Sequence, residues 1–261
     1  MALVGDIYTE QHGGGSPLLL FSGLSGVASA WSQLLPALVP HFQVVLHDHR
    51  GTGRSAASVI DYSIEQMASD VLTVMDGLGI ERADFIGHST GGAILQYLAL
   101  SAPSRVGKAV LSATWCAPDP YFVHGFAFRK QLLMRMGPEA YSRMSSLTTY
   151  PPDWYTANHA KIEQMEKEAV ARFPATEIQV SRIDAICRFD VRERLGDISA
   201  PTMVICARDD SLTPIALSRD VAERIPNARS HELAWGGHAA PSIASDDFAP
   251  AVLEFLRSSA A

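Results

Sequence analysis

The chain has 261 residues, 47% of them hydrophobic, with 28 acidic and 21 basic side chains and a formal net charge of −7. This balance predicts a globular protein with a large core, and the lack of a basic tract argues against a nucleic-acid partner. Three cysteines without paired spacing and no apolar run near the roughly 18 residues of a membrane helix predict a cytoplasmic protein outside the membrane, of a still open oligomeric state.

Short apolar runs alternate with helical patterns along most of the chain. The helix over 63–78 is the clearest, because Ser63 can cap it and Ile64, Met67 and Val71 repeat at helical spacing. The alternation predicts an α/β fold with a mostly parallel, doubly wound sheet. The expected strands are 18–21, 43–47, 83–86, 108–112, 201–206 and 229–233, and the expected helices are 31–39, 63–78, 91–100, 217–225 and 248–256.

The alternating pattern stops between residues 115 and 190. This part is rich in aromatic residues and methionine, has helical tendency and contains the break YPPDW. Because it does not form strand–helix units, we expect a helical cap (lid) over 115–190. The cap would be inserted into a core domain of residues 1–114 and 191–261.

The stretch GHSTG, residues 87–91, forms the pattern G-x-S-x-G between an expected strand and an expected helix. This pattern is typical of a nucleophile elbow, a sharp turn that projects a serine hydroxyl from the backbone. Such a turn has no room for side chains at Gly87 and Gly91, and Gly92 lets the helix approach the sheet. We therefore predict that Ser89 is a nucleophile, which then needs a base and a group that orients the base.

His238 is the best candidate for the base. It follows the expected strand 229–233 in the sequence WGGHA, where two glycines allow the loop to turn over the edge of the sheet. The other histidines lie before the first core strand, in the cap, inside strands or beside Ser89. The pair His47 and His49 has the spacing of two metal ligands, but no partner cluster accompanies it, so we expect no metal site.

The carboxylate that orients the histidine should follow the expected strand 201–206. Asp209 and Asp210 are adjacent there, and we favour Asp210 because its position suits a loop that turns back toward the histidine. We expect Asp209 to face solvent or to cap the loop. Asp119, after the strand 108–112, is a further candidate, for which a structural role is expected.

The order Ser89, Asp210, His238 and the loop DHRGTGRS, residues 48–55, resemble the α/β-hydrolase superfamily over the length of the chain. The segments SGLSGVASAW, DYSIEQMA, YPPDW, ICARDD and GGHA further resemble the aminoacrylate (carbamate) hydrolases of pyrimidine utilisation. The 3-oxoadipate enol-lactonases are near neighbours that share the GHS elbow. The resemblance implies a hydrolase without a cofactor, acting on a small polar substrate.

Two segments compete for the role of the oxyanion hole, the backbone N–H groups that bind the reacting oxygen. HGGG, residues 12–15, looks like the lipase motif but precedes the strand 18–21, so we interpret it as a hairpin turn joining an N-terminal strand near residues 3–9 to that strand. SGLSG, residues 22–26, follows the strand, where relatives carry a His-Gly pair. We therefore predict that Leu24 and Thr90 supply the N–H groups.

The leading functional hypothesis is acyl transfer to water through an acyl-enzyme at Ser89, in an aminoacrylate or carbamate hydrolase. A small-ester carboxylesterase or enol-lactonase is the alternative, and a ligand sensor with slow turnover is a remoter one, because fold alone does not settle function. Candidate pocket residues are His88, Trp115 and Trp154. The sequence contains no dinucleotide-binding or phosphate-binding loop, so no cofactor is expected.

Overall fold

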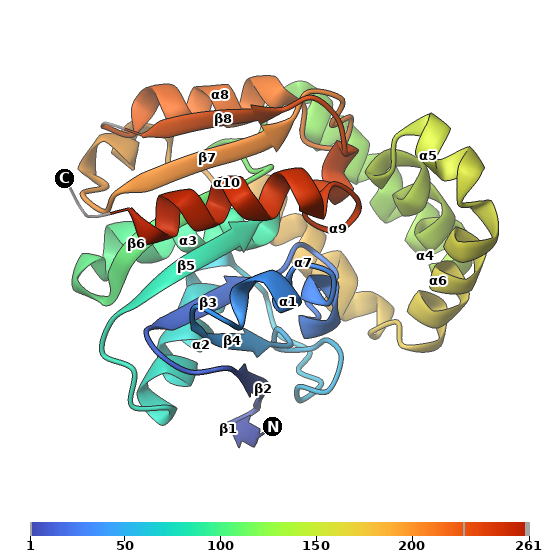
Figure 1. The fold of residues 1–261 in the computed structure, drawn as a ribbon. Coiled ribbons are helices and arrows are strands. Elements are labelled where there is room, and N and C mark those ends of the chain that lie inside the picture. The colour runs from blue at the N-terminus through green and yellow to red at the C-terminus, as the bar shows by residue number, and fades with distance from the viewer. Residues whose placement is uncertain (1, 227, 259–261) are drawn as a thin grey trace.

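A computed structural model of the chain describes residues 2–226 and 228–258. Eight strands in these residues form one sheet in the order β1-β2-β4-β3-β5-β6-β7-β8 (Figure 1). All neighbours from β4 to β8 are parallel, whereas β1 and β2 pair antiparallel with each other and β2 pairs antiparallel with β4. The strands are β1 (Ala2–Val4), β2 (Ile7–His12), β3 (Pro17–Phe21), β4 (Gln43–His47), β5 (Ala83–His88), β6 (Val106–Ser112), β7 (Thr202–Ala207) and β8 (Arg229–Leu233).

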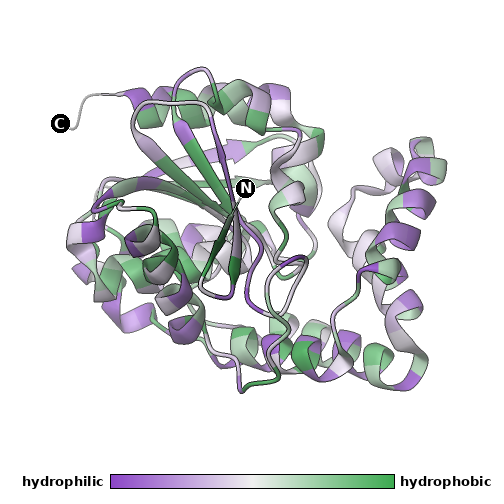
Figure 2. Cartoon of the chain, turned by 90° about the horizontal axis from the view of Figure 1, so that it is seen from below, coloured by the Kyte–Doolittle hydropathy of each residue, from purple (hydrophilic) through white to green (hydrophobic). Residues whose placement is uncertain are grey.

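Helices cover both faces of this sheet, which confirms the α/β architecture predicted from the alternating pattern. Leu19 and Phe21 face the core formed with α2 (Ile64–Gly77), α3 (Thr90–Ser101) and α8 (Ile215–Arg224). Leu18 and Leu20 face the opposite core, formed with the segment 28–38 and α10 (Ser245–Arg257). Figure 2 shows the apolar colour concentrated in the strands between the two helix layers. A central strand buried on both faces must be apolar throughout.

Four helices lie between β6 and β7, in the part of the chain that was expected to be helical. They are α4 (Pro120–Thr149), α5 (Pro152–Ala157), α6 (His159–Ala171) and α7 (Thr176–Arg188). Helix α4 bends sharply, because Gly137 has a φ of 82° and Pro138 cannot donate a backbone hydrogen bond. Figure 1 shows α4, α5 and α6 gathered at one end of the molecule. Among the described residues, no helix is long and apolar enough to cross a membrane.

The interpretation of residues 12–15 as a hairpin turn between β2 and β3 is wrong. β2 pairs with β4, and β4 separates it from β3. Two neighbouring parallel strands bury β3, whose apolar run suits a central place, whereas the half-exposed β2 suits a place near the edge. The hairpin that does form joins β1 to β2 through Gly5, which has a φ of 56°.

The helix expected over 31–39 is also wrong in its extent. The segment forms a 3-10 turn, η1 (Ala28–Trp31), and a separate single-turn helix, α1 (Leu35–Leu38). Pro36 lies in the first turn of α1, where its missing N–H costs nothing. In the middle of a longer helix the same proline would remove a hydrogen bond, so the helix cannot run through it.

Candidate active site

Ser89 occupies a strained turn between β5 and α3. Its backbone φ of 55° and ψ of −117° lie outside the regions that residues other than glycine usually adopt. A side chain at Gly87 would collide with the carbonyl of Gly91, and one at Gly91 would collide with the carbonyl of Phe21. A Cβ at Gly92 would lie 2.6 Å from Cβ of Thr114. The glycines of G-x-S-x-G therefore stand where the local geometry excludes every other residue.

His238 and Asp210 meet beyond the ends of β7 and β8. The ring Nδ1 of His238 lies 2.9 Å from Oδ2 of Asp210, and both side chains are almost completely buried. The other carboxylate oxygen of Asp210 accepts the backbone N–H groups of Leu212 and Thr213, each at 2.9 Å. Thus the carboxylate has a fixed orientation and holds Nδ1–H toward itself, which leaves Nε2 free to accept a proton.

Thr213 is a third member of this network that the sequence reasoning missed. Its hydroxyl lies 3.0 Å from Nδ1 of His238, 2.9 Å from Oδ2 of Asp210 and 3.0 Å from the carbonyl of Ala113. The single hydroxyl proton can be donated either to Oδ2 of Asp210 or to the carbonyl of Ala113, but not to both at once. The position three residues after Asp210 gave no sign that the side chain would turn toward the histidine.

Asp209 is exposed, as expected, and its carboxylate also bonds the backbone of the loop that carries His238. Its carboxylate accepts the backbone N–H of Gly237 at 2.8 Å and that of Gly236 at 3.3 Å. These two glycines have positive φ values and precede His238, so Asp209 braces the loop that carries the histidine. The two adjacent acids therefore have different contacts. Asp210 contacts the ring of His238, and Asp209 contacts the backbone of the two glycines before it. Asp119 caps α4 by accepting the N–H of Phe122 at 2.8 Å, as its expected structural role requires.

The loop of residues 22–26 lies directly against Ser89. A Cβ at Gly23 would be 3.3 Å from Cβ of Ser89, and the turn closes through a 2.9 Å hydrogen bond from Gly26 N–H to Gly23 carbonyl. Thr90 is the first residue of α3, where helix N–H groups have no partner within the helix. The described loops and turns contain no acceptor for the N–H of Leu24. His12, by contrast, contacts Glu10 on β2 at 3.1 Å.

The structure records no hydrogen bond between the Ser89 hydroxyl and His238 within the described residues. The recorded link between them is indirect: His88, the residue before Ser89, has its ring centroid 4.7 Å from that of His238. Catalytic hydrogen bonds are often long in unliganded enzymes and tighten when substrate binds.

The three predicted pocket residues have different surroundings. His88 is half-buried, bonds Ser112 Oγ at 3.1 Å, and desolvation together with the neighbouring His238 lowers its pKa well below the usual range. Trp115 is fully buried against Phe122, with ring centroids 4.4 Å apart. Trp154 stacks on Tyr150 at 4.9 Å. His88 therefore lies beside His238, whereas Trp115 and Trp154 contact Phe122 and Tyr150, in the segment between β6 and β7.

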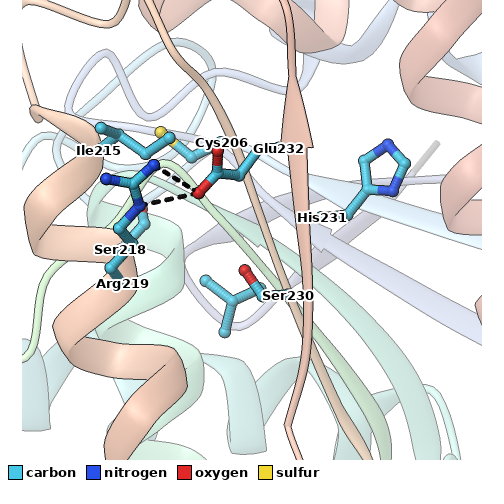
Figure 3. Close-up of a pocket in the computed structure, with 8 residues that line it drawn as sticks. Cys206, Ile215, Ser218, Arg219, Ser230, His231 and Glu232 are labelled. Carbon is cyan, nitrogen blue, oxygen red and sulfur yellow. Dashed lines mark hydrogen bonds and ion pairs between the residues drawn. The ribbon is translucent and has the colours of Figure 1, made fainter.

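Two further features bear on the chemistry. Among the described residues, no group of three or more His, Cys, Asp or Glu side chains is placed to hold a metal ion. Beside β8, a hollow of about 10 Å³ contains the ion pair of Arg219 with Glu232 at 2.7 Å (Figure 3). That volume admits about one water molecule at most, so this hollow cannot hold a substrate.

Comparison with known proteins identifies relatives along almost the whole chain. A family profile described as "alpha/beta hydrolase fold" matches residues 16–242. A protein from Azorhizobium caulinodans named "Putative carbamate hydrolase RutD" is 43% identical, over 96% of this chain and 94% of its own length. A protein of the same name from Caulobacter sp. (strain K31) is 40% identical, over 99% and 98%. The crystal structure of an enol-lactonase from Burkholderia xenovorans superposes with a TM-score of 0.88 at 28% identity, covering 97% of this chain and 96% of that one.

Proposed function

The chain belongs to the alpha/beta hydrolase fold family, and from this premise we propose that it is a serine hydrolase of the carbamate or aminoacrylate type. The observation that carries the proposal is a buried His238–Asp210 pair whose histidine ring centroid lies 4.7 Å from that of His88, the residue next to Ser89 in the strained elbow. The similarity to relatives named as carbamate hydrolases supports the substrate class, which is a small polar acyl compound.

In the proposed reaction, His238 Nε2 accepts the proton of the Ser89 hydroxyl as the oxygen attacks the carbonyl carbon of the substrate. The oxygen of that carbonyl becomes negatively charged, and the N–H groups of Leu24 and Thr90 bind it. Each such donor is worth about 2.7–4 kcal/mol in the barrier. His238 then donates the proton to the leaving group, and an acyl-enzyme remains on Ser89.

Water completes the cycle by the same groups in reverse. His238 takes a proton from the water molecule, whose oxygen attacks the acyl carbon, and the proton returns to Ser89 as the acyl group leaves. Asp210 retains its negative charge throughout and stabilises the transient imidazolium. No group outside the chain is needed for these steps, so we propose a reaction without a metal or an organic cofactor.

We further propose that residues 115–190 act as a cap over this site. The inserted helices contact the loops that carry the reacting groups: Ser211 Oγ donates to the carbonyl of Thr148 at 3.2 Å, and a Cβ on Gly237 would lie 2.9 Å from the carbonyl of Thr149. A cap in this position would exclude water from the reaction, which strengthens electrostatic interactions there.

Hydrolysis of an enol-lactone or a small ester is the second candidate. It is favoured by the superposition with the Burkholderia xenovorans enol-lactonase over nearly the full length of both chains. The elbow, the His–Asp pair and the predicted oxyanion donors would serve either substrate, because all of these reactions pass through a tetrahedral oxyanion.

The proposal is tested with purified wild-type protein and a Ser89→Ala variant. We expect wild type to react with a fluorophosphonate probe and to hydrolyse at least one member of a panel of carbamates, short p-nitrophenyl esters and enol-lactones. The panel also ranks the two candidate substrate classes. Loss of the nucleophile should lower kcat by about 10⁶-fold and abolish labelling.

Ser29→Ala, an exposed serine, is the matched control and should retain both activities. Labelling of the Ser89→Ala protein at the wild-type rate would exclude Ser89 as the nucleophile.

A further inference from the structure

The bent helix α4 lines a partly open cavity of about 210 Å³. The two halves of the helix face each other across it, because Gly137 and Pro138 turn the chain back on itself. Residues from both halves and from the loop after Asp210 line the cavity, among them Phe122, Phe126, Arg129, Met144, Thr148 and Leu212. It is smaller than the ~300–1,000 Å³ typical of drug-sized ligands, so it suits a small molecule.

Arg129 brings a buried positive charge to this apolar cavity. Only 6% of the residue is exposed, and its guanidinium lies 4.9 Å from the ring centroid of Phe126. Nη2 donates to Ser145 Oγ at 2.7 Å and to the hydroxyl of Tyr141 at 3.3 Å, but the buried Nε–H has no acceptor. A buried polar group without a partner is rare in folded proteins and calls for an explanation.

No carboxylate within the described ranges forms an ion pair with Arg129. The neighbouring Lys130, by contrast, pairs with Asp184 at 2.7 Å. The cavity lining includes no acidic residue. Burying an unpaired cation is costly, and an anion in the cavity would remove that cost.

We propose that this cavity binds a small organic carboxylate, that Arg129 pairs with the carboxylate group, and that this group belongs to the substrate of the hydrolase. The planar guanidinium still has donors for a carboxylate, and the aromatic walls would contact the carbon skeleton. The assignment of the ligand as substrate rests on the proposed function, whereas the existence of a carboxylate site does not.

The cavity is adjacent to the groups proposed for catalysis. Leu212 lines it, and the N–H of the same residue donates to Asp210. Phe122 lines it and packs on Trp115, which follows Thr114, whose hydroxyl donates to the Ser89 carbonyl at 2.9 Å. Two lining residues thus connect the cavity to the proposed catalytic groups: Leu212 belongs to the acid loop, and Phe122 reaches the elbow through Trp115 and Thr114.

The site is tested first by binding, with Ser89→Ala protein so that turnover plays no part. Crotonate and crotonamide have nearly the same shape but differ in charge, and their dissociation constants are measured by calorimetry. We expect crotonate to bind at least about tenfold more tightly, as a charge-assisted hydrogen bond implies. Equal affinities, or no saturable binding of crotonate, would overturn the carboxylate site.

Substitutions then assign the preference to Arg129. Adding Arg129→Met to the Ser89→Ala background should abolish the preference for crotonate, and Arg129→Lys should restore part of it. Arg135→Met, which removes an exposed arginine of the same helix, is the matched control and should keep the preference. A preference that survives Arg129→Met would exclude this residue. The comparison of the two ligands on Ser89→Ala protein decides the site even if Arg129→Met fails to fold.

Inhibition of wild-type p-nitrophenyl acetate hydrolysis identifies the ligand. Competitive inhibition by crotonate, at the concentration that saturates binding, is expected for a substrate carboxylate, and noncompetitive inhibition would overturn that assignment. If wild type hydrolyses no substrate and resists fluorophosphonate, the proposed function fails, yet the calorimetric result still decides the carboxylate site.

Discussion

Arg182 Nη2 donates a hydrogen bond of 3.1 Å to the carbonyl oxygen of Leu24, although the two residues are 158 positions apart in the sequence. Arg182 lies on α7 and is completely buried. The same Nη2 lies 3.1 Å from Nδ1 of His49, and Nη1 lies 3.4 Å from the carbonyl of Arg50. Through these contacts α7 fixes the loop that holds a predicted oxyanion donor.

Arg182→Met should therefore reduce catalysis more than substrate binding. The substitution leaves the carbonyl of Leu24 without the Arg182 donor, and the loop can shift away from the position that suits the oxyanion. We expect kcat to fall by about 10²-fold with a smaller change in KM, and Arg182→Lys to recover part of it. Steady-state kinetics on one substrate measures both parameters.

Arg188→Met is the control for this effect. Arg188 lies on the same helix and donates hydrogen bonds to Asp61 and to the carbonyl of Tyr62, which precede α2. It does not contact the loop of residues 22–26. A loss of kcat in Arg188→Met as large as in Arg182→Met would show that helix docking, and not the loop, is responsible.

Asp210→Asn and Asp209→Asn should separate the two adjacent acids. Each change removes one negative charge from the same loop. Asp210→Asn should lower kcat by about 10⁴-fold, because an amide can present its N–H groups to the ring and stabilise the wrong tautomer. Asp209→Asn weakens only the brace on Gly236 and Gly237, so we expect a loss nearer tenfold. Equal losses in the two variants would contradict this division of roles.

Thr213→Val tests the residue that the sequence did not reveal. It removes the hydroxyl contacts to Asp210 and His238 at almost constant volume, and kcat should fall about tenfold while the protein stays folded. Thr202→Val is the matched control, since Thr202 is an equally buried threonine whose hydroxyl donates to the Ala200 carbonyl, far from the histidine. Full activity in Thr213→Val would show that Asp210 alone orients His238.

Buried histidines should make the fold sensitive to acid. Burial lowers the pKa of His47 to about 4 and that of His49 well below the usual range. Between about pH 6.5 and 4, the unfolded chain binds a proton that the folded His47 does not, so the free energy of unfolding decreases as pH falls. For His47 alone the loss by pH 4 is about 3 kcal/mol.

Urea unfolding at intervals from pH 7.5 to 4 measures this slope. His47→Phe cannot titrate and should show a shallower decrease than wild type. His231→Gln, at an exposed position on β8, should follow the wild-type curve. An unchanged slope in His47→Phe would mean that other groups cause the acid sensitivity.

The sequence by itself determined the features that depend on neighbours along the chain. Strands and helices followed from the spacing of apolar residues and from capping residues such as Ser63, whose side chain accepts the N–H of Gln66 at 3.1 Å. The elbow was predictable because its glycines lie within three positions of Ser89, where a larger residue would collide with neighbouring atoms. The helix predicted over 31–39 is wrong in its extent because Pro36 lies inside that range and a helix cannot run through it.

Only the tertiary structure decided which distant groups would meet. The order of β2, β4 and β3 depends on which strand needs burial on both faces, and that competition involves the whole sheet. Two such contacts, Thr213 with His238 and Asp209 with Gly237, join loops at one end of the sheet, and the contact of Arg182 with Leu24 joins helix α7 to a loop at the same end. Side-chain hydrogen bonds form over about 3 Å in space between residues at any separation in the sequence, so no spacing of residue types predicts them.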